Sequence, residues 1–275
     1  MSEKTQEIIT KLKAGIEELF ESDKYADYLR FLSRFHNYSA GNCILINLQC
    51  PYASQVASYT DWTKMKRQVK KGAKAIKILA PHTYKDTDKE GKEHVYTGFH
   101  VASVFDVSQT YNPDGEALPA ITRALDYSVH NYNILLDTLI SIAPVPVDFE
   151  NISSGANGYF SCDEGCIVIK QGLPEMQTLK TLLHEMSHAY LHSKGADEEM
   201  ADRHTREVQA ESIAYVVSNY LGMDVSEYSF GYIAGWSGDK KLSQLRASLE
   251  VIRKTSDKII SDIENTLHQK GVVAA

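Results

Sequence analysis

The run HEMSH at residues 184–188 is the feature that most constrains what this chain of 275 residues can be. It lies in LPEMQTLKTLLHEMSHAYLHSKG, where Pro174 stands near the start and apolar residues recur at helical spacing, a pattern that predicts a helix over 174–193. Four residues advance a helix by roughly 400°, so His184 and His188 project from one face and can share a metal ion. Glu185 lies roughly 100° around the helix, where a carboxylate can act as the general base of a zinc peptidase. We therefore predict that His184 and His188 bind Zn²⁺ and that Glu185 is catalytic.

A catalytic zinc ion needs a third protein ligand. The metzincin pattern supplies it with a glycine and then a histidine after HExxH, but Leu191 and Lys194 occupy those places and exclude that pattern. The later run TREVQAESIAYVV offers Glu207 and Glu211 one helical turn apart. We choose Glu207, because the spacing Glu-x-x-Ala that begins there resembles the ligand helix of gluzincins. Glu211 is the alternative ligand, or a hydrogen-bond partner of a zinc histidine.

Four further side chains near this motif have competing interpretations. His192 lies on the same helix face, and we interpret it as a residue that caps the helix C-terminus rather than as a ligand. His204 is interpreted as an ordinary surface residue. Cys162 and Cys166 have the spacing C-x3-C without a second cysteine pair, so we expect a hairpin tip with buried thiols and not a structural zinc site.

Two other features near the motif could serve a peptide substrate. The strand CIVIK at 166–170 could be a sheet edge to which an extended peptide adds, although ordinary sheet packing explains it equally well. Tyr228, Tyr232 and Trp236 recur at intervals of four, which favours core packing. Tyr232 is nevertheless a candidate for stabilising the oxyanion of a tetrahedral intermediate.

The chain divides at the turn-rich stretch YNPDGEALP, residues 111–119, where Asn-Pro and Asp-Gly both favour turns. We predict one domain over 1–112 and a second over 120–275. The first has three helices, the third capped by Ser39, and then strands at 75–80 and 101–107 joined by a solvated hairpin arm.

The second predicted domain is mainly helical. After a helix over 120–142 and a strand over 145–149, GYFS and CIVIK form a hairpin; the later helices are expected at 174–193, at 205–221 and from Leu242 to Leu267. The predicted fold class is therefore α+β, with a small α/β N-terminal domain and a mainly helical, zincin-like domain of the gluzincin type that contains a small sheet.

The composition limits the location of the protein. The N-terminal residues form no unbroken apolar run, so we expect neither a signal peptide nor a membrane span, and no membrane partner. Four cysteines in 275 residues are too few for a disulfide scaffold. We expect a cytoplasmic protein. Its formal net charge of −7 argues against a wholly basic binder of nucleic acid.

The charge is unevenly distributed, however. Between Trp62 and Ile78 there is no acidic residue, and the cations there are Lys64, Lys66, Arg67, Lys70, Lys71, Lys74 and Lys77. We call this segment the lysine island. Aromatic residues occur nearby, namely Phe35, Tyr38, Tyr52, Tyr59 and Trp62. Cations that neutralise phosphates together with aromatic faces that stack on bases suit single-stranded DNA, whereas a solvated lysine-rich helix and turn is the alternative.

Three runs carry a family resemblance: RFHNYSAGNCILINLQCPYASQVASYTDW, VKKGAKAIKILAP and VFDVSQT. In this order they resemble the N-terminal single-stranded-DNA-binding domain of ArdC-type antirestriction proteins of plasmids and conjugative elements. In that family a zincin-like metallopeptidase domain follows, so HEMSH and EVQAESIAYVV stand where the resemblance implies. The positions that match the family signature are Asn37, Tyr38, Ser39, Asn42, Trp62, Lys70, Lys71 and Gly72. With the lysine island, the expected DNA-binding residues are Tyr38, Asn42, Trp62, Lys64, Lys66, Arg67, Lys70, Lys71 and Lys74.

The leading hypothesis from the sequence is a zinc metallopeptidase of a mobile genetic element that also binds single-stranded DNA, with a role in antirestriction or conjugation. Its partners would be single-stranded DNA and a protein or peptide substrate. One alternative is a protein without catalytic activity that covers DNA and holds a structural zinc ion. Another is a regulatory peptidase that cleaves a repressor.

Overall fold

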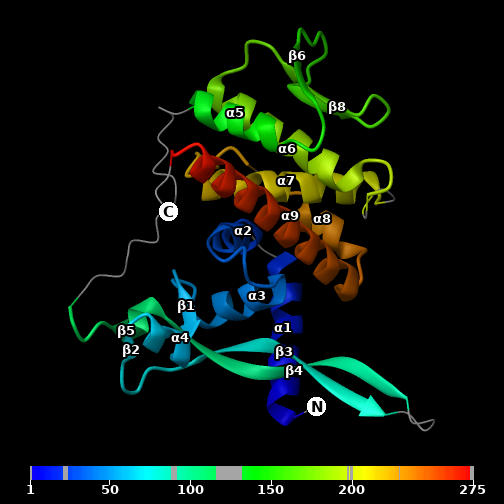
Figure 1. The fold of residues 1–275 in the computed structure, drawn as a ribbon. Helices are drawn as coiled ribbons and strands as arrows, with labels where there is room; N and C mark the ends of the chain where they lie inside the picture. Colours follow the sequence, from blue (N-terminus) through cyan, green and yellow to red (C-terminus); the bar gives the residue numbers. More distant parts are fainter. Residues whose placement is uncertain are drawn as a thin grey trace.

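The computed structural model describes residues 2–20, 24–87, 92–115, 132–196, 198, 201–228 and 230–272. Its elements form a stack, with a long hairpin at one end and a small sheet at the other, and helices between them (Figure 1). The N-terminal elements are α1 (Glu3–Phe20), α2 (Lys24–Arg34), α3 (Ala40–Gln49), β1 (Val56–Ser58), α4 (Tyr59–Lys64), β2 (Gln68–Val69), β3 (Ile76–Thr87), β4 (Glu93–Asp106), the 3-10 helix η1 (Val107–Gln109) and β5 (Thr110–Tyr111). The C-terminal elements are α5 (Tyr132–Ile142), β6 (Val147–Glu150), β7 (Gly158–Ser161), β8 (Cys166–Lys170), α6 (Glu175–His192), α7 (Arg203–Tyr220), α8 (Ile233–Gly238) and α9 (Leu242–Gln269).

The mixed helix and sheet content confirms the predicted α+β class. The expected cap of α3 forms, because the hydroxyl of Ser39 accepts a hydrogen bond from Asn42 N at 3.2 Å. The helix predicted over 120–142 is present as α5 from Tyr132, while residues 116–131 lie outside the described part of the chain. Among the described helices, none combines the length and the apolar character needed to cross a membrane.

Strands β3 and β4 are longer than the sequence predicted. They pair antiparallel from Ile76 opposite Val104 to Thr87 opposite Glu93, so the expected solvated arm is a continuous ribbon. Strand β4 ends before the predicted residue 107 because Asp106 turns the chain. Its buried carboxylate accepts hydrogen bonds from the backbone amides of Ser108, at 2.9 Å, and Ser54, also at 2.9 Å. Burial raises the pKa of Asp106, but these hydrogen bonds outweigh it and lower that pKa below its usual value.

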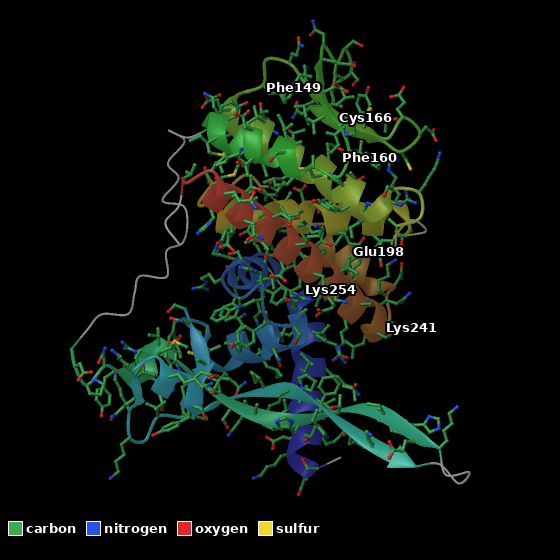
Figure 2. All side chains as sticks on the ribbon, viewed as in Figure 1. Phe149, Phe160, Cys166, Glu198, Lys241 and Lys254 are labelled. Carbon is green, nitrogen blue, oxygen red and sulfur yellow. The ribbon has the colours of Figure 1, made fainter. Side chains whose placement is uncertain are left out.

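The C-terminal sheet has the order β6-β8-β7, with β6 parallel and β7 antiparallel to β8. The hairpin of β7 and β8 is therefore confirmed. The proposal that CIVIK forms a sheet edge is wrong, because β6 pairs with its second side and makes β8 the central strand. The expectation of buried thiols is also wrong. Cys162 is exposed and Cys166 is half-buried at the hairpin tip, which lies at the end of the molecule away from the arm (Figure 2).

The N-terminal and C-terminal elements share a continuous core. Helix α2 packs against α7, and α1 and α3 pack against α9. Buried side chains from both parts, among them Ile16, Leu29, Val216 and Ile259, belong to one apolar cluster. The division into domains at 1–112 and 120–275 stays a prediction, and the two parts are joined by far more than a linker.

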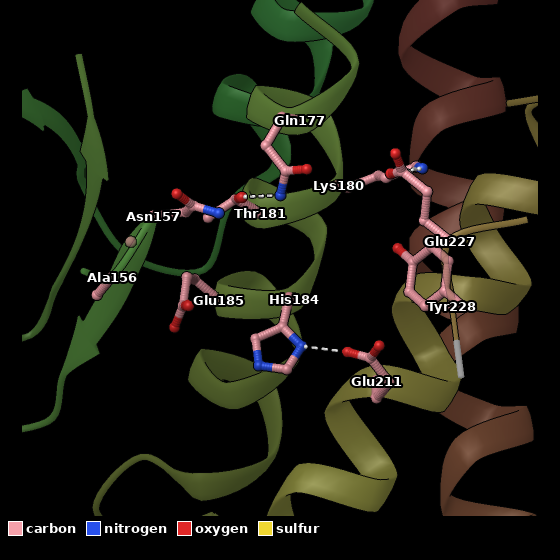
Figure 3. Close-up of a pocket in the computed structure, with 11 residues that line it drawn as sticks. Ala156, Asn157, Gln177, Lys180, Thr181, His184, Glu185, Glu211, Glu227 and Tyr228 are labelled. Carbon is pink, nitrogen blue, oxygen red and sulfur yellow. Dashed lines mark hydrogen bonds and ion pairs between the residues drawn. The ribbon is translucent and has the colours of Figure 1, made fainter. Parts of the chain in front are cut away.

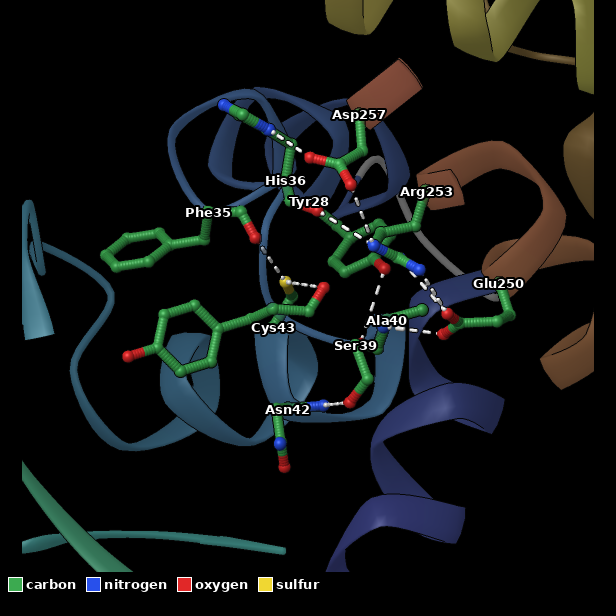
Figure 4. Close-up of polar contacts among 11 residues, drawn as sticks. Tyr28, Phe35, His36, Ser39, Ala40, Asn42, Cys43, Glu250, Arg253 and Asp257 are labelled. Atoms are coloured by element: carbon green, nitrogen blue, oxygen red, sulfur yellow. Dashed lines mark hydrogen bonds and ion pairs between the residues drawn. The ribbon is translucent and has the colours of Figure 1, made fainter. Parts of the chain in front are cut away.

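A polar clasp strengthens this junction where the loop between α2 and α3 meets α9 (Figure 4). Glu250 accepts a hydrogen bond from the backbone amide of Ala40 at 2.9 Å. Arg253 donates to Glu250 through Nη2 at 2.8 Å and to the carbonyl oxygen of His36 through Nη1 at 3.3 Å. Asp257 lies 2.8 Å from Nδ1 of His36 and also contacts Arg253. Arg253 thus neutralises two carboxylates and holds the N-terminal loop in place.

Replacing Arg253 with methionine tests this clasp. We expect the free energy of unfolding to fall by about 1 to 3 kcal/mol, because Glu250 and Asp257 would remain close together without their cation. Urea denaturation, analysed by its midpoint at constant slope, measures the change. The matched control is Lys254→Met on the exposed face of the same helix, which should leave the midpoint within experimental error. Equal midpoints for the two variants would contradict the assigned role of Arg253.

Candidate functional site

Helix α6 presents its two histidines as the sequence predicts. His184 and His188 lie on one face, and their Nε2 atoms are 3.1 Å apart. The opposite face of the helix is apolar and buried, through Leu182, Leu183 and Met186. Because burial of that face fixes the rotation of α6 about its axis, both imidazoles are directed toward α7.

Helix α7 supplies the carboxylates. Asp202 caps its N-terminus by accepting a hydrogen bond from Thr205 N at 2.9 Å. Ala210 is fully buried on the side of the helix that packs into the core. Of two glutamates one turn apart on α7, Glu207 lies close to both histidines of α6 and Glu211 contacts His184.

The three predicted ligands come together. Oε2 of Glu207 lies 3.6 Å from Nε2 of His184 and 3.8 Å from Nε2 of His188. Donors bound to a tetrahedral zinc ion at about 2.0 to 2.1 Å are about 3.3 Å apart, so these separations fit one metal ion. Two imidazoles and one carboxylate are also the donor set of catalytic zinc sites. His184, His188 and Glu207 thus form a candidate site for a divalent metal ion.

Glu211 contacts the other nitrogen of the first histidine. Its Oε2 lies 3.2 Å from Nδ1 of His184 (Figure 3). This is the arrangement in which a carboxylate orients a metal-binding imidazole by accepting its second N–H. Burial lowers the pKa of His184, but hydrogen bonds to Glu207 and Glu211 outweigh burial and raise it to about 10 in the absence of a metal. Hydrogen bonds from His184 and His188 hold the pKa of Glu207 well below its usual range.

The second histidine has an outer partner that the sequence did not identify. Nδ1 of His188 lies 3.0 Å from Nδ1 of His192, whose Nε2 lies 3.1 Å from Oε1 of Gln209. Gln209 donates to Glu198 at 3.0 Å. Burial lowers the pKa of His192 to about 4, so this imidazole is neutral near pH 7. A neutral His192 that donates from Nε2 to Gln209 leaves Nδ1 to accept from His188, which directs Nε2 of His188 to the metal position.

The interpretation of His192 as a helix cap is therefore wrong. The residue is buried between α6 and α7, and Ser193 is the C-cap. Its spacing of four from His188 was visible in the sequence, but its partner Gln209 lies on another helix. His204 is exposed as expected, with its ring 5.9 Å from that of Tyr232.

Glu185 lies beside the two histidines at the wall of a cavity of about 410 Å³. The carboxylate is largely buried, and burial raises its pKa, opposed by the nearby histidines and by a hydrogen bond from the backbone of Phe160 on β7. The cavity extends from His184 and Glu185 between β7 and the loop that carries Tyr228 (Figure 3). The cavity therefore leaves open space next to the candidate metal site and the carboxylate of Glu185.

The three aromatic residues after α7 do not share a helix face. Trp236 is buried in α8, with its ring 5.6 Å from that of Phe20, so core packing is confirmed for this residue. Tyr228 lines the cavity from the preceding loop. Tyr232 is partly exposed, and its pKa is raised mainly by burial and further by the charges of Glu211 and Glu207. Its role as an oxyanion stabiliser stays a prediction.

Three of the expected DNA-binding residues make hydrogen bonds to backbone groups of the fold, and one of them, Trp62, is fully buried. Trp62 has 0% of its surface exposed and donates from Nε1 to Phe105 O at 2.8 Å, so a stacking role for it is wrong in this structure. The amide of Asn42 pairs with both backbone groups of Leu79, at 2.9 and 3.0 Å, and joins α3 to β3. Tyr38 is half-buried and donates to Val56 O at 3.0 Å.

The lysine island remains at the surface. Lys64, Lys66, Lys70, Lys71 and Lys74 are all exposed, across α4, β2 and the following turn. Arg67 is half-buried and donates to Thr110 at 2.7 Å, which ties β2 to β5. Two exposed tyrosines accompany these cations: Tyr59 begins α4, and Tyr111 lies on β5 opposite Gln68 of β2. Tyr111 was not predicted, because only the pairing of β5 with β2 brings it to the island.

Two family models match separate parts of the chain. Residues 1–109 match the model described as the N-terminal domain of anti-restriction factor ArdC. Residues 143–223 match the Peptidase M78 model, described as the IrrE N-terminal-like domain, and this range includes the candidate metal site. The predicted resemblance to ArdC-type proteins is confirmed by this pair of domains.

Solved structures with the same fold include two of the antirestriction ArdC protein from plasmid R388. The metal-free structure has a TM-score of 0.59 at 18% identity and covers 83% of this chain and 86% of that chain. The Mn(II)-bound structure has a TM-score of 0.54 at 15% identity and covers 92% and 97%. At these identities the likeness establishes the fold. Among curated proteins, the uncharacterised protein pXO2-81 of Bacillus anthracis is 27% identical over 96% of this chain, which spans about half (53%) of that relative.

Exchanging each α7 carboxylate for an amide tests the assignment of the third ligand. We expect purified Glu207→Gln protein to lose bound zinc, because a neutral amide replaces the third donor. Glu211→Gln should retain stoichiometric zinc with an affinity reduced about 10- to 100-fold, since it loses only the partner of His184 Nδ1. Metal analysis of the proteins after dialysis against a weak chelator measures both. Retained zinc in Glu207→Gln together with its loss in Glu211→Gln would reverse the assignment.

Proposed function

We propose that this chain, which combines an ArdC-type N-terminal domain with an IrrE-like domain, is a zinc-dependent peptidase that also binds single-stranded DNA. The observation that carries the proposal is the convergence of His184, His188 and Glu207, with Glu185 beside them at the wall of a cavity. A purely structural metal site has no need for a buried carboxylate next to its ligands. The R388 protein, which shares this fold, has a Mn(II)-bound structure, and this supports a divalent ion as the metal of the present chain.

Each residue of the site would have a separate role in peptide hydrolysis. A bound Zn²⁺ would polarise the scissile carbonyl and make water more acidic. Glu185 is placed to accept a proton from the attacking water and then to donate it to the leaving amine. Glu211 and His192 hold the two imidazoles in orientation through their Nδ1 atoms. Tyr232 is the candidate donor to the oxyanion.

Strand β7 is the edge at which we place the substrate. Within the described residues β7 pairs with β8 alone, and its N-terminal end borders the cavity at Gly158. A Cβ atom at Gly158 would lie 2.7 Å from Cγ2 of Thr181 on α6, so a glycine permits the close approach of β7 to the active helix. An extended peptide that adds to β7 would pass along the cavity beside Glu185.

The lysine island is the proposed DNA surface. Its exposed lysines can neutralise phosphates, and Tyr59 and Tyr111 offer exposed rings to bases. Trp62 and Asn42 would support this surface from inside the fold. The island lies at the arm end of the stack, far from α6 and α7 in Figure 1. DNA binding and peptide cleavage would therefore use separate faces.

The setting that we propose is protection or processing when the DNA of a mobile element reaches a new cell, in keeping with the antirestriction name of the R388 protein. Both a DNA-covering protein with a structural metal and a peptidase that cleaves a repressor are compatible with the same fold. They differ in the features that they require. The DNA-covering protein needs the lysine island but not Glu185, whereas the peptidase that cleaves a repressor needs Glu185 and no binding of DNA.

Exchange of the general base tests the peptidase. We expect Glu185→Gln to lower the rate of peptide cleavage about 10²- to 10⁴-fold while zinc content stays stoichiometric, because the amide cannot accept a proton. Mass spectrometry of cleaved peptides and metal analysis measure the two effects. Glu175→Gln, an exposed change in the first turn of the same helix, is the control. If wild-type and Glu185→Gln proteins give identical cleavage and identical cellular proteomes, the DNA-covering alternative is favoured.

A salt titration tests the DNA surface. Affinity for a fluorescent single-stranded oligonucleotide should fall as salt rises, and the double change Lys70→Ala and Lys71→Ala should lower the log–log slope by about 1.4, at about 0.7 per phosphate contact. Tyr111→Ala should weaken binding by about 1 to 3 kcal/mol, while Tyr111→Phe keeps the stacking face. Lys254→Ala on α9 serves as the control. No binding at low salt would remove this half of the proposal.

A further inference from the structure

One cation lies in the cavity beside the candidate metal site. Lys180 precedes His184 by one turn on α6, and only 8% of its side chain is exposed. Its Nζ lies 3.1 Å from Oε2 of Glu227 and 5.5 Å from the centre of the Tyr228 ring. In Figure 3, Lys180, Glu227 and Tyr228 line the side of the cavity opposite Asn157.

Lys180 and Glu227 differ in how far their side chains are exposed to solvent. Lys180 is fixed to the active helix and enclosed, so its ammonium group needs a counter-charge at all times. The side chain of Glu227 is 74% exposed, on the loop between α7 and α8. An exposed carboxylate gains little from such a pair, because water screens it and its side chain loses freedom on pairing. Another carboxylate can therefore replace Glu227 at low cost, whereas the ammonium group of Lys180 is enclosed.

We infer that Lys180 forms a substrate-specificity site that binds a carboxylate group of the peptide next to the scissile bond. Glu227 holds this place when no substrate is bound. This inference rests on the proposed peptidase and names its substrate class: peptides with an acidic residue, or with a free C-terminus, at a fixed position beside the cleaved bond. Both sources supply the same chemistry, a carboxylate that accepts hydrogen bonds from a buried ammonium group.

The neighbours of Lys180 are consistent with recognition of a carboxylate. Thr181 and Gln177, hydrogen-bonded to each other at 3.3 Å, line the same cavity and add polar groups to its wall. The ring of Tyr228 lies against the ammonium and shields it from solvent on one side. A buried cation in a partly enclosed cavity favours a charged group over a neutral one of the same shape, because an uncharged amide in the place of Glu227 would exchange a carboxylate contact of the ammonium for a neutral one.

Cleavage of defined peptide mixtures by the zinc-loaded full-length chain tests the inference. One mixture varies a single position among Glu, Gln and Lys with amidated C-termini, and a second carries free C-termini, so that the two sources of carboxylate are distinguished. We expect cleavage to favour one carboxylate source by about tenfold or more over its neutral counterpart. Lys180→Met should remove the preference, Lys180→Arg should retain it, and Lys180→Glu should shift it to peptides with lysine. Lys254→Met on α9 should change nothing.

Binding gives a second readout that does not depend on turnover. Fluorescent peptides are titrated onto Glu185→Gln protein and onto the same protein with Glu227→Gln added. Removal of the competing carboxylate should tighten binding of the acidic peptide and leave the Gln peptide unchanged. Circular dichroism of each variant separates loss of specificity from loss of fold.

The possible results separate the two proposals. Cleavage without preference for a carboxylate overturns the role of Lys180 and leaves the peptidase intact. Absence of cleavage for every peptide overturns the peptidase, and the binding titration then decides the carboxylate site alone. Equal affinities for the Glu, Gln and free-terminus peptides in that titration would overturn the inference.

Discussion

The pairing of α6 with α7 is the contact on which the candidate site depends. Helix α6 brings two imidazoles to one side, but it carries no carboxylate that can complete their donor set. Helix α7 brings Glu207 within 3.8 Å of both imidazoles, and Glu211 to the second nitrogen of His184. The two helices pack closely against each other. The separations between donors are therefore set by helix packing before any metal binds.

The packing of α6 against α7 also orients the two histidines, through contacts at their Nδ1 atoms. His184 meets a carboxylate at Nδ1, whereas His188 meets the neutral imidazole of His192, which is itself fixed by Gln209. The two metal-facing nitrogens thus have different outer partners, one charged and one neutral. A second carboxylate behind His188 would add negative charge to a site that already contains Glu185, Glu207 and Glu211 close together. A neutral partner gives orientation without that repulsion.

The N-terminal part is bound into this architecture. Helices α1 and α2 complete the core beneath α7 and α9, and the clasp of Arg253 fixes the start of α3. The lysine island and the metal site occupy distant parts of one packed stack (Figure 1). Several positions of the family signature have structural roles there. Trp62 fills the core beneath the island, and Asn42 satisfies the backbone of β3, so these residues shape the DNA surface that we propose without lying on it.

The sequence by itself determined the local features: the helix with its two histidines and adjacent glutamate, the cap at Ser39, the β7–β8 hairpin and the lysine island. These follow from periodicity, capping and charge within a few residues. Tertiary structure decided everything that depends on residues far apart in the chain. Strand order made β8 central and left β7 as the edge, helix packing buried His192 against Gln209, and core packing buried Trp62. Spacing along one element predicts which side chains share a face, but burial and partners depend on which other element covers that face.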